Sequence, residues 1–388
     1  MRRAAAILAV VGLQLSGCGG AAPTDAGAAL DASSGPGDDA RVGEDPGGDA
    51  GPGGSDGGPP EEGLVPVFLA QGYAGRTVVS CDLGRTWTAD RSDPEPETCE
   101  GIDCGHHAGA ARGVTFGDGW FFATFGWGPP GEVRRSRDGA TWESVTEETT
   151  FAGLAYGNGR LLGGGKWGAQ YSPDQGETWE SANVGRVLDV PNARSAHFLP
   201  HGDGLFVIAG SKSGDHDLIL SSDATEWWHP EILPEPCGGG TFTSGGVELV
   251  RNAVVAVGGG FACRSTDGGR TFEAFAIDPE VDRWRSDMVS DGRTISVWAD
   301  GRRYLSDDEG QTWTWEAVTP EGAPGRTIAY GAGVYVGADR QYDEQALYRS
   351  EDGVHWERLP AGAFEPGHRI QHMVFAWIEP NEVCRAMP

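Results

Sequence analysis

The stretch SDDEGQTWTW, residues 306–315, places three acids, one glycine and two tryptophans within ten positions. Carboxylates this close together could ligate a metal ion or serve as the acid and base of a hydrolase. The same order of residues recurs along the chain, however, which favours a structural role. We call the recurring segments boxes 1 to 7; they occupy residues 80–87, 136–142, 172–179, 221–227, 265–272, 306–313 and 350–356.

The residue types of a box suit a tight turn. Its Asp carboxylate and Ser hydroxyl bond the backbone of the turn itself, while glycine supplies a positive φ. The Thr and the aromatic residue that follow begin the next strand, and the aromatic ring packs over the turn. We therefore expect the box aspartates to be structural rather than catalytic or metal-binding.

The boxes also define a repeat. Successive box aspartates lie 56, 36, 49, 44, 41 and 44 residues apart, and a unit of forty-odd residues is typical of repeat architectures. The pattern Ser-x-Asp-x-Gly-x-Thr-Trp resembles the Asp-box, or BNR repeat, of the sialidase superfamily and other β-propellers. This resemblance covers residues 64–384 and implies an all-β fold.

Each repeat divides into four short strands. The third, for example, reads TFAGLAYGNG, RLLGGGKW, GAQYSPDQG and ETWESAN, with turn residues at the boundaries. Four-stranded units repeated radially form propeller blades. Box 1 has only three such strands nearby, so HRIQHMVFAW at 368–377 is expected to supply the inner strand. The sequence thus predicts a seven-bladed β-propeller closed by pairing of its N- and C-terminal segments, which removes open sheet edges.

Arginines recur on the predicted innermost strands. Five of them fall at one position, four residues before the last bulky residue of the strand, where the other two blades have Ala152 and, roughly, Gly245. A ring of guanidinium groups would bind carboxylate, sulfate or phosphate. Alternatively, each arginine pairs with a nearby acid and ties two blades together. The five are Arg112, Arg194, Arg285, Arg326 and Arg369.

Four more residues are candidates for ligand binding at the same rim. Trp127 and Trp167 lie in glycine-rich segments and could stack on a sugar ring, or only cover a neighbouring blade. His106 and His107 lie close to Cys104 and could form a metal cluster with it, but no Cys-x-x-Cys pair accompanies them. We therefore predict no metal site and no cofactor.

Six cysteines follow Cys18, an even number that favours disulfides in an exported chain. The blade arrangement brings them together in pairs: one pair at the box rim after the closing strand, one at the opposite rim, and one within a single inserted loop. The predicted disulfides are Cys81–Cys384, Cys237–Cys263 and Cys99–Cys104.

The N-terminal segment is typical of an exported lipoprotein. Arg2 and Arg3 precede an apolar run that is too short to span a bilayer, and Leu15-Ser16-Gly17-Cys18 resembles the bacterial lipobox. Residues 1–17 are expected to be a signal peptide and Cys18 to be lipidated, the alternative being a secretory signal with an incidental cysteine. Lipidation implies anchoring to a membrane of the cell envelope. Because Gly19 rather than aspartate follows the cysteine, we expect the outer membrane or cell surface.

Composition separates a tether from the propeller. Residues 18–63 are nearly all Gly, Ala, Asp, Pro, Ser and Glu, cannot bury a core, and are expected to form a disordered acidic linker. Residues 64–388 are expected to form the propeller. The net charge of −28 argues against nucleic acid as a partner, and we expect a monomer.

Two functions of different kinds fit this sequence. Sialidases have a Tyr–Glu nucleophilic pair, an acid/base Asp and an Arg-Ile-Pro segment before the boxes; LVPVFLAQGYAGRT, which precedes box 1, contains no such segment. The resemblance therefore implies the fold and not the catalytic set. We predict a binding or recognition module for an anionic glycan or a protein partner. The alternative is a sialidase-like or other propeller glycoside hydrolase that uses two loop carboxylates.

Overall fold

The computed structural model separates the chain into two compact units, Met1–Gly48 and Asp49–Pro388. All described residues belong to the second unit. The predicted signal peptide, Cys18, the tether up to residue 62 and the predicted Cys99–Cys104 disulfide lie outside them. The described residues are 63–72, 75–88, 111–125, 131–149, 151–165, 168–184, 195–200, 203–212, 215–237, 242–281, 286–320, 324–325, 327–338, 346–359 and 370–387.

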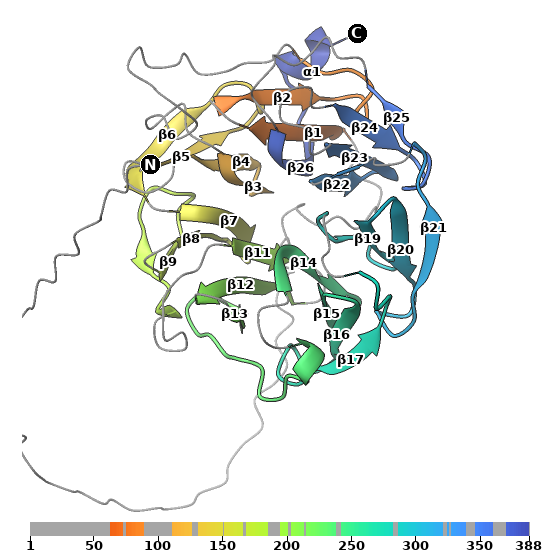
Figure 1. Ribbon diagram of the computed structural model, residues 1–388. Helices are drawn as coiled ribbons and strands as arrows, with labels where there is room; N and C mark the ends of the chain where they lie inside the picture. Colours follow the sequence, from red (N-terminus) through yellow and green to blue (C-terminus); the bar gives the residue numbers. More distant parts are fainter. Residues whose placement is uncertain are drawn as a thin grey trace, which may run out of the picture. The chain divides into compact units, whose positions relative to one another are not determined.

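Seven antiparallel sheets are arranged around a common axis as the blades of a β-propeller (Figure 1). We number each blade after its box and give its strands from the axis outward. Blade 1 consists of β26 (Ile370–Ile378), β1 (Val65–Gly72) and β2 (Thr77–Ser80); blade 2 of β3 (Ala111–Gly117), β4 (Trp120–Phe125), β5 (Gly131–Ser136) and β6 (Glu143–Thr149); and blade 3 of β7 (Phe151–Gly157), β8 (Arg160–Gly165), β9 (Gly168–Ser172) and β10 (Glu180–Ser181).

The remaining four blades follow in chain order. Blade 4 consists of β11 (Ser195–Leu199), β12 (Leu205–Lys212) and β13 (Asp215–Ser221); blade 5 of β14 (Phe242–Val250), β15 (Ala253–Gly258), β16 (Phe261–Ser265) and β17 (Glu273–Ala276); blade 6 of β18 (Val289–Ser290), β19 (Ile295–Ala299), β20 (Arg302–Ser306) and β21 (Thr314–Ala317); and blade 7 of β22 (Ile328–Gly331), β23 (Val334–Ala338), β24 (Leu347–Ser350) and β25 (Glu357–Arg358). A 3-10 helix, η3 (Glu235–Cys237), lies between blades 4 and 5, and α1 (Glu382–Ala386) follows β26. No helix among the described residues is long and apolar enough to cross a membrane.

Pairing of the chain's two ends closes the ring, as predicted. β26 runs antiparallel to β1, with Val67 opposite Ala376 and Leu69 opposite Val374. Val67, Phe68, Leu69 and Ala70 are fully buried. The last strand of the chain therefore covers the first, and blade 1 has its inner strand only because residues more than 300 positions apart pair.

Two blades have one strand fewer than predicted among the described residues. In blade 1 the segment expected as the outer strand forms no strand, although Thr88 N–H donates to Val79 O at 2.8 Å. In blade 4 a bridge between Leu220 and Trp228 stands in for it. Two hydrogen bonds hold each segment without a continuous ladder: in blade 4 both are between backbone groups, and in blade 1 the second is from Val79 N–H to the Thr88 hydroxyl.

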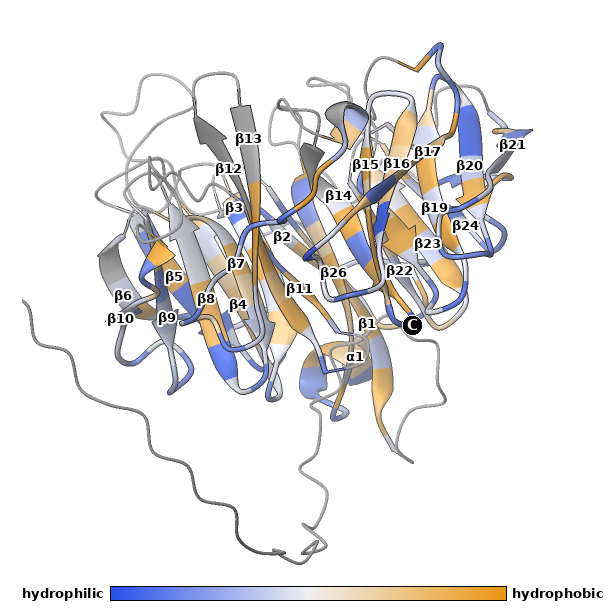
Figure 2. Ribbon diagram, turned by 90° about the horizontal axis from the view of Figure 1, so that it is seen from below, coloured by the Kyte–Doolittle hydropathy of each residue, from blue (hydrophilic) through white to orange (hydrophobic). Residues whose placement is uncertain are grey.

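The core lies between neighbouring blades. Six successive residues of β15 are buried, as are all five of β19, because these middle strands have a blade on either face. Val255 and Val257 of β15 belong to the same buried cluster as Ile295 and Val297 of β19. Figure 2 shows the corresponding pattern, with hydrophobic residues along the strands and hydrophilic residues at the turns.

The boxes form the turns that their sequence predicts. In box 6 the Asp308 carboxylate accepts from the backbone N–H of Gln311 (3.1 Å) and Thr312 (2.8 Å) and from the Thr312 hydroxyl (2.6 Å). The Ser306 hydroxyl donates to Asp308 and accepts from Gly310 N–H. Burial, the largest effect, acts to raise the pKa of Asp308, but these hydrogen bonds together lower it. The aspartates of the other six boxes accept equivalent bonds.

Glycine in the box meets two demands at once. Gly310 has a φ of +87°, and a Cβ atom there would lie 2.9 Å from Val255 of the preceding blade. The Trp313 indole N–H donates to the Gly310 carbonyl at 3.0 Å, so the ring covers the turn as expected. Box 4 differs, because its Trp227 indole donates to Ala182 O of blade 3 instead.

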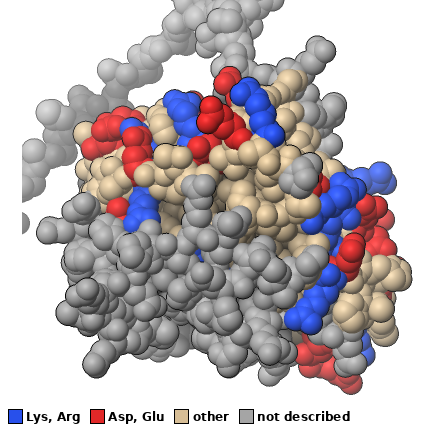
Figure 3. Space-filling model, turned by 90° about the horizontal axis from the view of Figure 1, so that it is seen from above, with Lys and Arg blue, Asp and Glu red and all other residues tan. Residues whose placement is uncertain are grey.

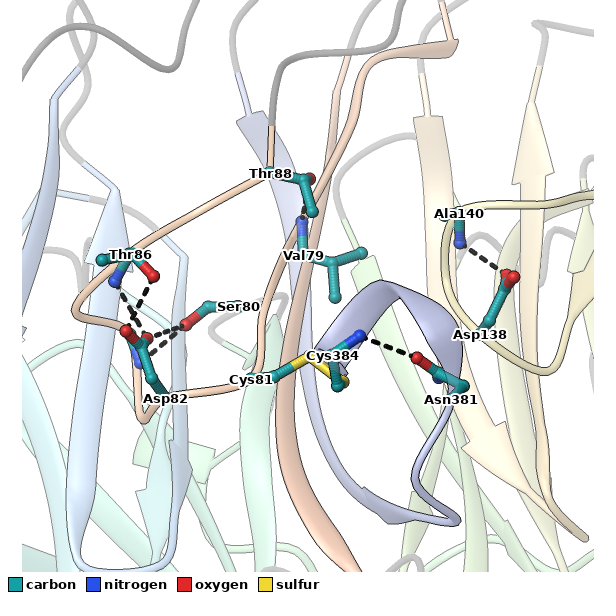
Figure 4. Close-up of a disulfide and its surroundings, with 11 residues drawn as sticks. Val79, Ser80, Cys81, Asp82, Thr86, Thr88, Asp138, Ala140, Asn381 and Cys384 are labelled. Carbon is teal, nitrogen blue, oxygen red and sulfur yellow. Dashed lines mark hydrogen bonds between the residues drawn. A yellow bond between two sulfur atoms is a disulfide. The ribbon is translucent and has the colours of Figure 1, made fainter. Parts of the chain in front are cut away.

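Both predicted disulfides whose cysteines are described are present. Cys81, the second residue of box 1, bonds Cys384 of α1, with Cα atoms 5.4 Å apart, and Cys237 of η3 bonds Cys263 of β16 with Cα atoms 5.8 Å apart. Figure 4 shows the first beside the box 1 turn, where Asn381 caps α1 by accepting from Cys384 N–H at 2.9 Å. This disulfide ties the closing segment to the box rim.

Candidate functional site

Of the nine residues predicted to bind a ligand, the structure describes Arg112 alone. It lies on β3, the inner strand of blade 2, and its side chain is partly exposed. The other eight, which include both histidines and both tryptophans, lie outside the described residues: Arg194, Arg285, Arg326, Arg369, His106, His107, Trp127 and Trp167.

A β-bulge marks the position of Arg112. Ala111 pairs with Phe125 and Gly113 with Thr124, so Arg112 is the extra residue of the bulge. Blade 3 shows the same shift at Ala152, since Phe151 pairs with Gly165 and Gly153 with Gly164. Bulges redirect a side chain and are frequent beside functional sites. The position chosen from sequence is thus structurally equivalent in these two blades.

Blade 1 corrects the prediction for Arg369. In β26, Ile370 pairs with Gly72 and His372 with Gln71, so the bulged residue is Gln371. Phe375 lies against Gly331 of blade 7, just as Tyr156 of blade 3 lies against Gly117 of blade 2. Phe375 is therefore the residue of β26 from which the arginine position has to be counted. The sequence-based prediction counted back four residues from Met373 instead of from Phe375, and so selected a residue two positions before Gln371. Arg369 is therefore not at the equivalent position.

Ionisable residues on other inner strands escaped the sequence analysis. His197 lies on β11, directly before Phe198, and Glu248 lies on β14, directly before Leu249. Asp287 lies just before β18 of the next blade and is close enough for its charge to act on Glu248. The signal was available, because each of SAHFL and GGVELV contains one titratable residue among apolar ones.

Burial changes the protonation of these groups. Desolvation, followed by the negative charge of Asp287, raises the pKa of Glu248 to about 8. Desolvation lowers the pKa of His197 to about 4. At neutral pH Glu248 is thus largely protonated and His197 neutral, although both side chains keep some accessible surface. A protonated carboxyl beside a second acid can donate a proton or a hydrogen bond, which is the arrangement of an acid–base pair.

Metal binding has no comparable support. Among the described residues, no group of three or more His, Cys, Asp or Glu side chains could hold a metal ion. The Cys104 and histidine cluster considered above lies outside them.

Five arginines other than the predicted ones tie neighbouring blades together. Each extends from one blade to the box of the next, where it donates to a backbone carbonyl or pairs with a carboxylate. The contacts are Arg135 to Gln175 O, Arg160 to Asp223 O, Arg264 to the Glu309 carboxylate, Arg303 to Asp352 O and Arg349 to Leu83 O.

These contacts occupy the polar groups of the box rim. Arg135 also binds Glu143 (2.6 Å) and Glu177 (2.8 Å), and its guanidinium lies over the Trp120 ring. Figure 3 views the propeller from the side, and there the basic side chains of the described residues lie next to acidic ones. The box rim is therefore held together internally.

We expect Arg349→Gln to destabilise the fold by about 1–3 kcal/mol, since Arg349 is nearly buried and its Nε donates to Leu83 O at 2.8 Å. Arg358→Gln is the matched control, because Arg358 lies on the exposed outer strand of the same blade. Urea unfolding of both variants measures the difference. Equal midpoints for Arg349→Gln and the parent chain would show that the contact does not brace the blades.

The strand order described above establishes the fold, and comparison with known proteins adds only distant similarities. No protein-family model and no curated protein matches the chain. Among solved structures, YCF48 bound to a D1 peptide is similar over 82% of this chain and 94% of its own, at 14% identity and a TM-score of 0.49. AztD of Citrobacter koseri is similar over 81% of this chain and 98% of its own, at 12% identity and a TM-score of 0.49. A GH74 enzyme of Niastella koreensis is similar over 78% of this chain and 44% of its own, at 15% identity and a TM-score of 0.42.

Proposed function

We propose that this chain is a lipid-anchored recognition module of the cell envelope, whose propeller binds an anionic glycan or a protein partner at the rim opposite the boxes. The observation that carries the proposal is the bulge at Arg112 on the inner strand of blade 2. It recurs at the same position in blades 1 and 3, although the side chain changes from Gln371 to Arg112 to Ala152.

A repeated backbone irregularity with a varying side chain is what a binding surface on a repeat fold requires. In blades 2 and 3 the bulged residue is partly exposed, whereas Gln371 of blade 1 is buried. Substitution at the partly exposed positions alters recognition while the blade remains intact. By contrast, the seven box aspartates keep one residue type and accept bonds from their own turns. We therefore assign ligand binding to the bulge position of the inner strands and stability to the box aspartates.

A screen of the purified full-length chain tests this function. Binding to anionic oligosaccharides on a glycan array, or to a protein captured by cross-linking and identified by mass spectrometry, without turnover of fluorogenic glycosides, is the expected result. Steady turnover of any glycoside would contradict it.

The carboxyl pair of blades 5 and 6 favours a hydrolase as the second candidate. Glu248, protonated near neutral pH, would donate a proton to the leaving-group oxygen, and the Asp287 carboxylate would take a proton from the attacking water. In that case turnover should disappear in both Glu248→Gln and Asp287→Asn. Turnover that persists in either variant would exclude this pair as the acid and base.

We expect lipidation at Cys18, so Cys18→Ser should leave the chain unprocessed or release it from membranes. The thiol is the only group at this position that can take a thioether-linked lipid, and two or more acyl chains are needed for stable anchoring. Metabolic labelling with an alkynyl fatty acid measures the change. Label that persists in Cys18→Ser would contradict the assignment.

A further inference from the structure

One tryptophan of blade 6 is exposed to an unusual degree. Trp315 on β21 keeps 52% of its surface, and among the described residues Ile232 is the only other large hydrophobic residue recorded as exposed. An exposed indole on an outer strand gains little from burial, so its presence calls for another cause.

The other blades show that the fold does not need an aromatic residue there. Trp315 stands two residues after the box aromatic and pairs with the third strand opposite Tyr304. The same register position is occupied in blades 2, 3, 5 and 7 by Ser144, Ser181, Ala274 and Arg358. Because the repeats tolerate small and polar residues at this position, the tryptophan is specific to blade 6.

Contacts beneath the indole fix its orientation. The Arg302 guanidinium carbon lies 4.2 Å from the Trp315 ring centroid. Arg302 Nη1 is 3.2 Å from the Asp278 carboxylate of the preceding blade, and the Tyr304 hydroxyl donates to the same carboxylate at 2.8 Å. Such a network holds the indole as a rigid plane, with one face on the guanidinium.

Polar groups beside this plane remain available. Arg302 uses Nη1 for its contacts with Asp278 and with the Tyr304 hydroxyl, so Nε and Nη2 donate no hydrogen bond to any described residue. Its side chain is 36% exposed. Arg302 directly follows the turn between β19 and β20, so it lies at the end of β20 toward the rim opposite the boxes.

We propose that Trp315 and Arg302 form a carbohydrate-binding site at the outer edge of blade 6. The C–H face of a pyranose ring packs on the free indole face, and Arg302 Nε and Nη2 donate to its ring substituents. Stacking supplies apolar contact and the guanidinium supplies orientation, the combination that sugar recognition requires. This site is separate from the inner-strand position of Arg112 and does not depend on the function proposed above.

The test is a glycan array of neutral, amino-sugar and uronic-acid oligosaccharides, probed with the labelled full-length chain. Saturation-transfer difference NMR with the best-bound oligosaccharide then measures affinity. We expect Trp315→Ala to weaken binding at least tenfold, Trp315→Phe to retain most of it, and Arg302→Lys to weaken it severalfold because the planar donor pair is lost. Ile232→Ala, the matched control at the other exposed hydrophobic residue, should bind like the parent chain.

Two outcomes overturn the inference. One is a chain that binds none of the printed oligosaccharides; the other is Trp315→Ala binding with unchanged affinity while its thermal unfolding matches the parent. If binding is instead lost in Arg112→Gln and kept in Trp315→Ala, the glycan site is at the inner strands. That result rejects the present inference and leaves the proposed function standing.

Discussion

Deleting residues 366–388 abolishes the cooperative unfolding transition of the chain. Without β26, the backbone of β1 has unpaired N–H and C=O groups, and the buried residues Val67 and Leu69 become accessible. The loss also opens the ring, so blades 7 and 2 lose the inner strand between them. A net stability of roughly 5–15 kcal/mol cannot absorb these changes. Circular dichroism during thermal denaturation measures the result.

The disulfide must be separated from the strand in this experiment, because the deletion removes both. Cys81→Ser with Cys384→Ser keeps β26 and eliminates a covalent loop of 303 residues. We expect this variant to lose about 3–5 kcal/mol and still unfold cooperatively. If the truncated chain melts at the temperature of this control, strand pairing contributes nothing beyond the disulfide, and the closure described here is wrong.

Replacing Glu248 by Gln stabilises the fold above neutral pH. The folded-state pKa of Glu248 is about 8, against 4.5 for an ordinary glutamate. The folded chain therefore holds an extra proton between these values, and stability falls as pH rises through this window. The full loss is about 4–5 kcal/mol above pH 8. Gln keeps the shape and carries no charge, so urea midpoints of Glu248→Gln should change less between pH 5 and 9 than those of the parent.

Asp287→Asn provides the control for this result. It removes the neighbouring charge but leaves the desolvation of Glu248, so we expect a smaller reduction of the pH dependence. The box aspartates do not interfere, because their lowered pKa values act only at acid pH, where stability falls as they become protonated. Parallel curves for Glu248→Gln and the parent would show that Glu248 ionises normally.

The sequence predicted what local chemistry determines. A box turn depends on hydrogen bonds within a few residues, so Asp308 and Gly310 could be assigned from residue type alone. The ring closure followed from the missing strand in the first repeat. The pairings of Cys81 and Cys237 followed from the order of strands, since each blade places its turns on a fixed rim.

Contacts between blades could not be predicted from local sequence patterns. Arg349 reaches the box 1 turn 266 residues away, and no local pattern distinguishes it from the exposed Arg358. The raised pKa of Glu248 likewise arises from burial in the folded chain and, second, from the charge of Asp287 on the next blade. For Arg369 the error had a local cause, because the bulge and the aromatic residues at the end of β26 obscured which residue corresponds to Phe116 of blade 2.

Two substitutions in blade 2 test most directly whether recognition and stability are divided between the two rims. Arg112 lies on the inner strand and Asp138 in the box of the same blade. Isothermal titration calorimetry at several salt concentrations measures the affinity for the anionic glycan that binds most tightly on the array. Arg112→Gln should weaken this affinity about tenfold or more and reduce its dependence on salt. Asp138→Ala should lower the melting temperature and leave the affinity of the folded fraction unchanged. Unchanged affinity in Arg112→Gln, with reduced affinity in folded Asp138→Ala, would contradict the account.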